Sequence, residues 1–459
     1  MKLKKISAIL LTALMVVSLT TGCVSSYVDK TTEAPAPQTT QAPQPTQGTN
    51  TEPGTTEAPA PSTEVDISGQ KLVVWYAVSG TSGELFNKLS ENFAKEYGVE
   101  LEATYSGGSG DTATKVSAAL LTHTQPDVAL MYAGPLYTGG EGDFRISDLL
   151  KNTSDFNQAD VFEGMMDYCD YMGEGICALP CGISTQVMYY NKDILKAAGV
   201  DMANPPKTWS EFYDVCGKVM ASAGGNESLK AFDTNDEAWL FKSMLMQNGC
   251  EIIENNGGEI TPIFNNEKAV EVGDYWKSLV DAGYMSAAQH SNAEKAFLGG
   301  NLAFIAASSN RISRWTGTTG FELGAIEMPY FTQPSLALGG NVLVILTEDE
   351  SKLAAAWKYV TYLTNAANNT EFALGTGYLP IHKSAMERQE VKDAIASNEM
   401  YTVAFNQLSY TWAYTHFQEM GTMDTQIKSA LGKLEKDRGT SKELLDKAVK
   451  EVQSEIDDK

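Results

Sequence analysis

The sequence predicts an α/β protein, and two observations lead to that prediction. Between residues 71 and 132, apolar runs typical of strands alternate with helical patterns in the order β-α-β-α-β. A second set of strands and helices begins at residue 186. Short strands that alternate with helices form parallel sheets with helices packed on their faces. The length of 459 residues allows one large two-lobed domain or two to three ordinary domains.

The first set of elements also predicts where a ligand would bind. Strands are expected at 71–77, 99–105 and 126–132, and helices at 85–97 and 111–123, the first of them ending at Gly98. Ligands of such sheets bind beyond the carboxyl ends of the strands. The candidates at or just past those ends are Tyr76, Ser79, Gly80, Ser109 and Tyr132.

The second set mixes strands with longer helices. Strands are expected at 186–191, 302–307, 324–327 and 341–346, and helices from 192, from 208, over 239–246, over 269–282 and from 440 to the end. Pro205 and Pro206 prevent the helix from 192 from continuing. Thr208 with Glu211, and Thr440 with Glu443, have the spacing of capping boxes.

The N-terminus has the pattern of a processing signal. Three lysines within residues 2–5 precede an apolar run at 6–19 that is too short for a durable membrane span. The sequence that follows, LTTGC, resembles a bacterial lipobox, although Thr20 stands where Leu is usual. We expect a signal peptide at 1–22 and lipidation of Cys23. The alternative is an ordinary secretory signal with an incidental Cys.

A stretch rich in Thr, Pro, Ala, Gln and Glu follows the Cys and predicts a disordered tether over 23–66. No later segment has about 18 consecutive apolar residues, so we expect no other span. A diacylglyceryl Cys carries two acyl chains, which is enough for stable anchoring. These features predict a module tethered to the outer face of a cell membrane, of the Gram-positive type.

Charge and cysteine content exclude several classes. The formal net charge of −24 argues against nucleic-acid binding, which needs clustered Lys and Arg. Five cysteines remain after Cys23, namely Cys169, Cys177, Cys181, Cys216 and Cys250. Their scattered positions predict buried thiols, with one disulfide within 169–181 as an alternative. The four isolated His indicate no metal site, and no cofactor is expected.

The chain resembles the family 1 extracellular solute-binding proteins, which are receptors of ABC importers for sugars and for glycerol-3-phosphate. The most specific segment is 187–212 (VMYYNKDILKAAGVDMANPPKTWSEF). Supporting segments are VWYAVSG at 74–80, QPDVALMY at 125–132, FLGGNLAFIAASS at 297–309, LGGN at 338–341 and GTGYLPIHKSA at 375–385. The resemblance implies the type II periplasmic-binding-protein-like fold, in which two α/β lobes joined by a hinge close on a ligand between them. It places one lobe at 67–185 plus about 335–382, and the other at 186–334 plus about 383–459.

The same resemblance supplies site residues one at a time. In the glycerol-3-phosphate-binding type, ligand residues match Ser184, Ser308, Gly340 and Tyr378 in kind, and an aromatic of the cleft matches Trp239. Three positions differ, because a Tyr, a Glu and an Arg of that type fall on Ser109, Ala133 and Glu419. We therefore expect a shared scaffold and a different, larger ligand.

Sugar recognition needs flat aromatic faces and planar polar groups inside a closed cleft. The aromatic candidates are Trp239, Trp315, Tyr378 and Trp412, with core packing as the alternative for each. Gly340 would let a ligand approach the backbone, and the Gly-rich turn at Ser109 could bind a hydroxyl or an anion. Arg311 and Arg314 could bind the acidic group of a ligand, such as a uronic acid or a phosphate, or could form surface salt bridges.

These features predict a monomeric, non-enzymatic receptor for a sugar or short oligosaccharide, delivered to separate permease chains. The alternatives are an anchored polysaccharide hydrolase and a glycan-binding adhesin. Paired carboxylates could hydrolyse glycosides, but no pair of acids stands out in a predicted site. The sequence also has no GxSxG, GxxxxGK[ST] or HExxH motif.

Overall fold

The computed structural model describes residues 65–133, 145–151, 153–413 and 416–458. The chain divides into the units Met1–Thr63 and Glu64–Lys459, and the described helices and strands belong to the second. The predicted signal peptide, Cys23 and most of the predicted tether lie outside the described residues. Among the helices that are described, none combines the length and the apolar character that a membrane crossing would require.

The first sheet has five strands in the order β2-β1-β3-β14-β6. Its strands are β1 (Lys71–Tyr76), β2 (Glu100–Tyr105), β3 (Val128–Tyr132), β6 (Leu179–Ser184) and β14 (Gly339–Ile345). β1 runs parallel to both β2 and β3, which confirms the predicted β-α-β-α-β unit. β14 joins from much later in the chain and is antiparallel to β3 and β6.

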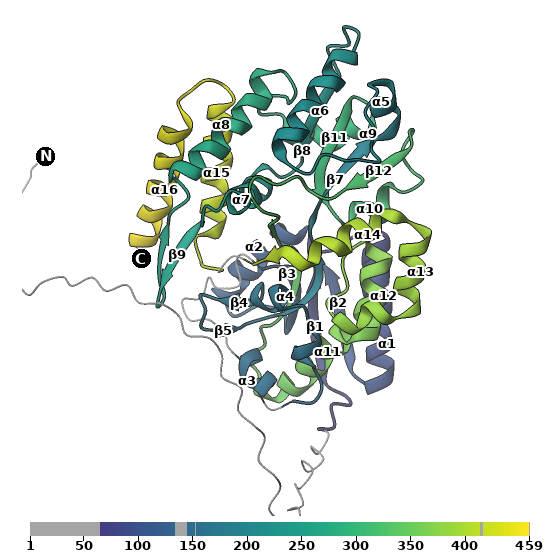
Figure 1. Ribbon diagram of the computed structural model, residues 1–459. Coiled ribbons are helices and arrows are strands. Elements are labelled where there is room, and N and C mark those ends of the chain that lie inside the picture. The colour runs from purple at the N-terminus through teal and green to yellow at the C-terminus, as the bar shows by residue number, and fades with distance from the viewer. Residues whose placement is uncertain (1–64, 134–144, 152, 414–415, 459) are drawn as a thin grey trace, which may run out of the picture. The chain divides into compact units, whose positions relative to one another are not determined.

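The second sheet has four strands in the order β12-β7-β11-β8. Its strands are β7 (Gln186–Asn191), β8 (Lys230–Thr234), β11 (Leu302–Ser308) and β12 (Leu323–Ile326). β8 is parallel to β11, and β7 is antiparallel to both β11 and β12. In Figure 1 this sheet lies in the upper half of the view and β1, β2 and β3 lie in the lower half.

Helices α1, α2, α11 and α12 pack against the first sheet, and α1, α11 and α12 also pack against one another. Their bounds are α1 (Thr81–Tyr97), α2 (Ser109–Leu120), α11 (Leu353–Thr364) and α12 (Ala366–Thr376). α1 ends at Gly98, which adopts a left-handed φ of 68° as the sequence predicts. It begins at Thr81, earlier than the expected residue 85, because the weakly patterned Thr-Ser-Gly-Glu segment completes its first turn.

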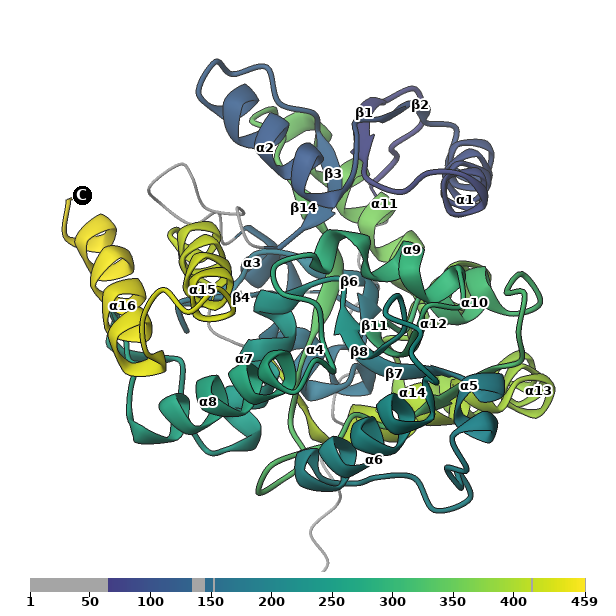
Figure 2. The ribbon, with the colours of Figure 1, turned by 90° about the horizontal axis from the view of Figure 1, so that it is seen from above.

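A separate apolar cluster joins the second sheet to the helices around it. Those helices are α6 (Trp209–Ser222), α7 (Glu237–Gln247), α8 (Glu267–Asp281), α15 (Met420–Leu434) and α16 (Ser441–Asp457). Thr208 and Thr440 form the predicted capping boxes at the starts of α6 and α16. α15 and α16 lie side by side in both ribbon views (Figures 1 and 2).

The remaining elements are short. They are helices α3 (Arg145–Lys151), α4 (Glu163–Asp167), α5 (Lys192–Ala197), α9 (Ala293–Leu298), α10 (Arg311–Trp315), α13 (Gln389–Ser397) and α14 (Glu399–Asn406), and strand pairs β4 (Asp170–Tyr171) with β5 (Gly175–Ile176), β9 (Ile253–Asn256) with β10 (Glu259–Pro262), and β13 (Leu336–Ala337) with β15 (Thr411–Trp412). The five cysteines after Cys23 are buried and free, so the disulfide within 169–181 is wrong. Burial raises the pKa of Cys181 to about 12, as expected for an unreactive thiol.

The chain passes between the two sheets at several places. The buried side chain of Gln407 connects its own segment to two others, at Gln186 and Met328. The first passage is Thr185, between β6 and β7. Gln407 Nε2 donates to the Gln186 carbonyl (2.8 Å), and its Oε1 accepts from the Met328 amide (2.8 Å). The Ser243 hydroxyl donates to Gln186 Oε1 and accepts from the Ala337 amide, each at 3.1 Å. The junction between the sheets is therefore held by neutral amides and a hydroxyl. The lobe boundaries expected from the sequence remain a prediction.

Candidate ligand-binding site

The start of β14 brings several predicted site residues together. Gly339 pairs with Ser184 on one side, and Asn341 pairs with Tyr132 on the other. Gly340 has φ of 123°, and a Cβ atom there would lie 2.1 Å from the Gly182 carbonyl oxygen. Only glycine fits that position. The structure thus places Ser184 and Tyr132 beside the start of β14, where Gly339 and Gly340 have no side chains.

Trp239 lies against this stretch from the second sheet. Asp236 caps the start of α7, with Oδ1 accepting from the Trp239 amide (3.3 Å). The indole Nε1 donates to the Ala337 carbonyl (2.9 Å), and a Cβ atom on Gly339 would lie 2.9 Å from Trp239 Cζ2. The ring is therefore held in one orientation against glycine backbone, while the residue stays only half-buried. A fixed and partly open indole is suited to stacking.

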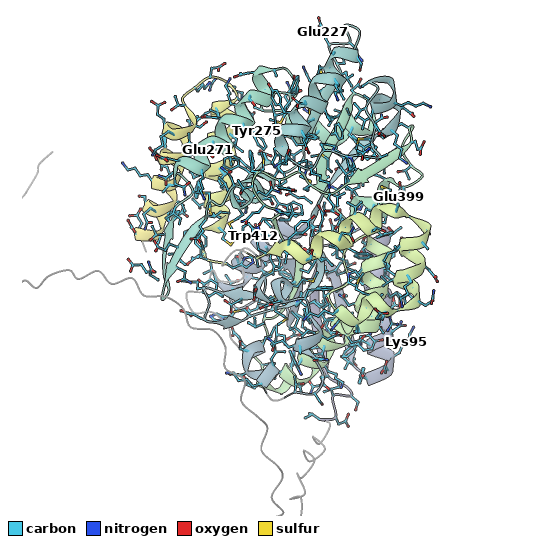
Figure 3. The ribbon with its side chains drawn as sticks, in the orientation of Figure 1. Lys95, Glu227, Glu271, Tyr275, Glu399 and Trp412 are labelled. Atoms are coloured by element: carbon cyan, nitrogen blue, oxygen red, sulfur yellow. The ribbon has the colours of Figure 1, made fainter. Side chains whose placement is uncertain are left out.

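Trp412 is anchored to Ala337, the residue that also holds the Trp239 indole. It pairs with Ala337 where β13 and β15 meet, and its carbonyl accepts from the Leu338 amide (3.0 Å). The residue is half-buried and lies between the elements of the two sheets (Figure 3). Two tryptophans far apart in sequence thus attach to one short strand.

Tyr378 approaches β14 from the segment after α12. Its ring stacks on Phe372 (centroids 6.2 Å apart), and its hydroxyl accepts from Asn341 Nδ2 (3.1 Å). Gly182 gives the ring room, because a Cβ atom there would lie 3.1 Å from it. Burial raises the pKa of Tyr378, so its hydroxyl stays neutral at physiological pH.

Ser308 ends β11 and pairs with Gln186, one residue beyond the Thr185 crossing. It is half-buried, and its hydroxyl accepts from the Asn310 amide (3.3 Å). The Tyr189 hydroxyl donates to its carbonyl (3.0 Å) and fixes the end of the strand. Ser308 therefore lies at the junction with a hydroxyl that a ligand could share.

Other predicted residues are placed differently. Trp315 is 3% exposed and packs on Tyr189 and Phe297 in the apolar core, so we do not retain it as a ligand contact. Tyr76 is buried against Phe86 (centroids 4.9 Å apart), with its hydroxyl accepting from Asn87 Nδ2. The side chain of a tryptophan or tyrosine packs well in a core, which sequence position alone does not separate from a ligand surface.

Three further predicted residues, Ser79, Ser109 and Glu419, lie on elements other than β14 and its neighbours. Ser79 is exposed in the loop after β1, and Ser109 is the half-buried first residue of α2 rather than part of a turn before it. Glu419 is buried at the start of α15. Burial, and then the nearby Glu419 carboxylate, raises the pKa of Tyr171 to about 12.

Of the two arginines, Arg311 is engaged within the protein. Its guanidinium donates to Glu294 Oε2 from Nη2 (3.0 Å) and from Nε (3.3 Å), and to Asn310 Oδ1 from Nη1 (2.9 Å). The salt-bridge alternative is therefore confirmed for Arg311. Arg314 is exposed on α10.

Two polar residues near this region are not among the sequence-predicted site residues. Lys242 is only 1% exposed, and its Nζ contacts Asp424 Oδ1 at 2.6 Å. It follows Trp239 by three residues, so both occupy one face of α7. The second is Asn341, the last residue of the LGGN segment. A lysine within the apolar run of α7, and an Asn directly after two glycines, were the available signals.

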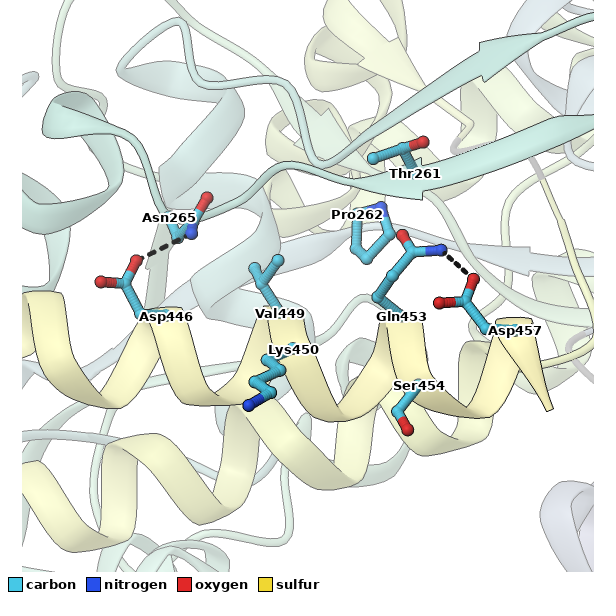
Figure 4. A pocket seen from close by; sticks show the side chains of 9 residues that line it. All are labelled: Thr261, Pro262, Asn265, Asp446, Val449, Lys450, Gln453, Ser454 and Asp457. Atoms are coloured by element: carbon cyan, nitrogen blue, oxygen red, sulfur yellow. Dashed lines mark hydrogen bonds between the residues drawn. The ribbon is translucent and has the colours of Figure 1, made fainter. Parts of the chain in front are cut away.

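Two other polar features lie apart from these residues. An open depression of about 520 Å³ lies between β10 and α16, lined among others by Thr261, Asn265 and Asp446 (Figure 4). Asn265 Nδ2 donates to Asp446 Oδ1 there (2.8 Å).

The second feature is buried among β8, α8 and α15. His290 Nδ1 contacts Asp233 Oδ1 (2.5 Å), and its Nε2 contacts Glu435 Oε1 (3.0 Å). The carboxylates hold opposite nitrogens, so the three groups do not converge on one metal position. Among the described residues no group of three or more His, Cys, Asp or Glu is placed to hold a metal.

Comparison with known proteins decides the family. The sequence profile of bacterial extracellular solute-binding proteins matches residues 88–399. The chain belongs to this family. This solute-binding protein is 24% identical over 331 residues to the sn-glycerol-3-phosphate-binding periplasmic protein UgpB of Escherichia coli K12, covering 68% of this chain and 74% of the relative.

Solved structures confirm the predicted fold of this solute-binding protein. The cyclic α-maltosyl-1,6-maltose binding protein of Arthrobacter globiformis superposes with a TM-score of 0.73 at 21% identity, over 84% of this chain and 98% of that one. UgpB of Mycobacterium tuberculosis, in complex with glycerophosphocholine, gives 0.73 at 22% identity over 85% and 99%. A cyclo/maltodextrin-binding protein with maltotetraose gives 0.68 at 18% identity, over 84% and 97%. The relatives named here are binding proteins.

Proposed function

We propose that this solute-binding protein captures a sugar or short oligosaccharide between its two lobes and delivers it to the permeases of an ABC importer, without chemical turnover. The observation that carries this proposal is Trp239, a half-buried indole fixed by Ala337 and set against Gly339. An aromatic face covers the C–H face of a sugar ring, and neighbouring hydroxyls and amides bind its hydroxyls. The proteins of similar fold named for maltose-type oligosaccharides support this ligand class.

The charges around the site favour a neutral ligand over glycerol-3-phosphate. A buried phosphate needs cations or several convergent N–H donors. Lys242 is engaged with Asp424, and Arg311 with Glu294. Glu419 stands where the resemblance expects an Arg, and a carboxylate there would repel phosphate. Arg314 also lies close enough to act on Tyr378, and it would be the first position to mutate if phosphate bound.

Capture would proceed by hinge closure at the junction described above. A ligand shifts the balance between open and closed forms only by its greater affinity for the closed one. A thermal-shift screen across mono- and oligosaccharides tests the proposal, because a ligand at 100 times its Kd stabilises the folded protein by about 2.7 kcal/mol. We expect a rise in melting temperature with at least one sugar. No rise with any of them would contradict the proposal.

We also propose that Cys23 is lipidated and holds the protein at the outer face of the cell membrane. The support is its place after a basic and apolar segment and before the Thr/Pro-rich stretch. Cys23→Ser should release the protein into the medium or leave it unprocessed, as fractionation and labelled fatty acid would show. A variant that remains anchored and still incorporates the label would contradict this assignment.

A further inference from the structure

Asn341 has a buried amide group that the protein only half satisfies. The residue is 1% exposed, at the second position after Gly339 in β14. Its Nδ2 donates to the Tyr378 hydroxyl, and its Oδ1 has no partner among the described residues. If the amide oxygen and nitrogen were exchanged, Oδ1 would face the Tyr378 hydroxyl and Nδ2 would be the atom without a partner. In either orientation one end of this amide has no partner within the part of the chain that the structure describes.

Such a group is costly to leave alone. A buried polar atom without a partner destabilises a protein by about 1–3 kcal/mol. Asn369 shows how the same fold treats a buried amide with a purely structural role, because its Nδ2 donates to the Cys181 carbonyl (2.9 Å) and its Oδ1 accepts from the Ile381 amide (3.0 Å). The positions next to Asn341 are more open, since Gly340 and the paired Tyr132 are both half-buried.

The satisfied end of Asn341 belongs to a relay that crosses between the two sheets. Glu294 binds Arg311, and Arg311 Nη1 donates to Asn310 Oδ1 (2.9 Å). That bond turns the amide nitrogen of Asn310 away from Arg311. Burial raises the pKa of Tyr378, and the nearby Asn310 side chain opposes this rise. The relay thus starts beside α9 and α10 of the second sheet and ends on Asn341 of the first.

We propose that the free end of Asn341, presented together with the Tyr378 hydroxyl, binds one hydroxyl group of an uncharged ligand and sets the preference for polyhydroxylated solutes. A hydroxyl both donates and accepts, so it satisfies either end of the amide and either proton arrangement of Tyr378. Because Asn310 and Arg311 follow β11 of the second sheet and Asn341 lies in β14 of the first, this position lies where the two sheets meet. This inference rests on the proposed function and adds a specificity residue to it.

Asn341→Leu and Asn369→Leu are a matched pair that tests the assignment. Leucine at 341 removes the unsatisfied end of the amide together with a single bond to the Tyr378 hydroxyl, so the melting temperature of the ligand-free protein should change little. Leucine at 369 breaks two satisfied bonds and should lower it. Calorimetry with maltose, maltotriose and glycerol-3-phosphate should show an affinity loss of about tenfold or more for the bound sugar in Asn341→Leu, and little change in Asn369→Leu.

Asn341→Ala provides the same test of binding if the leucine variant fails to fold. A lowered melting temperature with unchanged sugar affinity in the 341 variants would make Asn341 structural and overturn the inference, while leaving the proposed function intact. A wild-type protein that binds only glycerol-3-phosphate would overturn the proposed function and the stated preference for uncharged ligands together. A wild-type protein that binds none of the three, and no sugar in the thermal-shift screen, would contradict both.

Discussion

The molecule contains two buried polar regions of opposite character. Beneath α8 and α15, His290 lies between the carboxylates of Asp233 and Glu435, and Trp276 Nε1 also donates to Glu435 (2.7 Å). At the junction of the two sheets, the side chains that join the chain passages are the neutral Gln407 and Ser243. Partners of a buried charge are hard to exchange, whereas neutral amides and hydroxyls can exchange partners at small cost. The comparison indicates that the region around the second sheet is rigid and that the junction between the sheets can rearrange.

The largest effect is expected in the charged region. His290→Ala would leave two buried carboxylates without their shared partner, which should destabilise the protein by about 3–5 kcal/mol in urea unfolding. His123→Ala is the control, because His123 is exposed and pairs with Glu348 at the surface. The control should change stability by about 1 kcal/mol or less. Equal effects of the two substitutions would contradict the ionic description of the cluster.

The same region predicts a pH dependence. Burial opposes the charge on His290, but the hydrogen bonds to Asp233 and Glu435 outweigh it and raise the pKa of His290 to about 10. A raised pKa stabilises the fold fully below the unfolded value of 6.5, and this stabilisation is lost as pH rises toward 10. The stability difference between the wild type and His290→Ala should therefore shrink across that window. A constant difference in unfolding experiments from pH 6.5 to 10 would be inconsistent with a charged His290.

A smaller loss is expected at the junction. Gln407→Leu keeps the size of the side chain but leaves the Met328 amide and the Gln186 carbonyl without a partner, which should destabilise the protein by about 1–3 kcal/mol. Gln389→Leu, on an exposed position of α13, should stay within about 0.5 kcal/mol. Urea unfolding compares them. If Gln407→Leu is as stable as its control, the side-chain amide of Gln407 does not stabilise the junction between the two sheets.

The smallest effect on stability is expected at Trp239, where the effect falls on binding. Trp239→Ala should fold and lose about 1–3 kcal/mol of sugar-binding free energy through lost apolar contact and stacking. Trp315→Ala removes a core side chain and should instead destabilise the fold by about 3–5 kcal/mol. Calorimetry and thermal unfolding of the two variants separate these roles. An unchanged Kd for Trp239→Ala would remove it from the site.

Local sequence patterns predicted much of the fold because caps, stops and apolar periods act over a few residues. The β-α-β-α-β unit, the glycine stop at Gly98 and the capping box at Thr208 follow from such patterns. The entry of β14 into the first sheet between β3 and β6 depends on pairing across more than 150 residues, which no local pattern encodes.

The site was predictable only in part for the same reason. Glycines before a strand indicated Gly340 correctly as a place that only glycine can occupy. Trp239 and Trp315 look alike in sequence, and only tertiary packing shows that one is half-buried and the other is in the core. The free amide end of Asn341 depends on what surrounds it in space, so no property of the local sequence marks it.

Isothermal titration calorimetry of the wild-type protein with maltose, maltotriose and glycerol-3-phosphate tests the central claim most directly. We predict that at least one of the two sugars binds with a Kd on the order of micromolar, which corresponds to about −8.2 kcal/mol. We also predict no binding of glycerol-3-phosphate, because Arg311 and Lys242 are already paired with carboxylates. Micromolar binding of glycerol-3-phosphate, with neither sugar bound, would contradict the account.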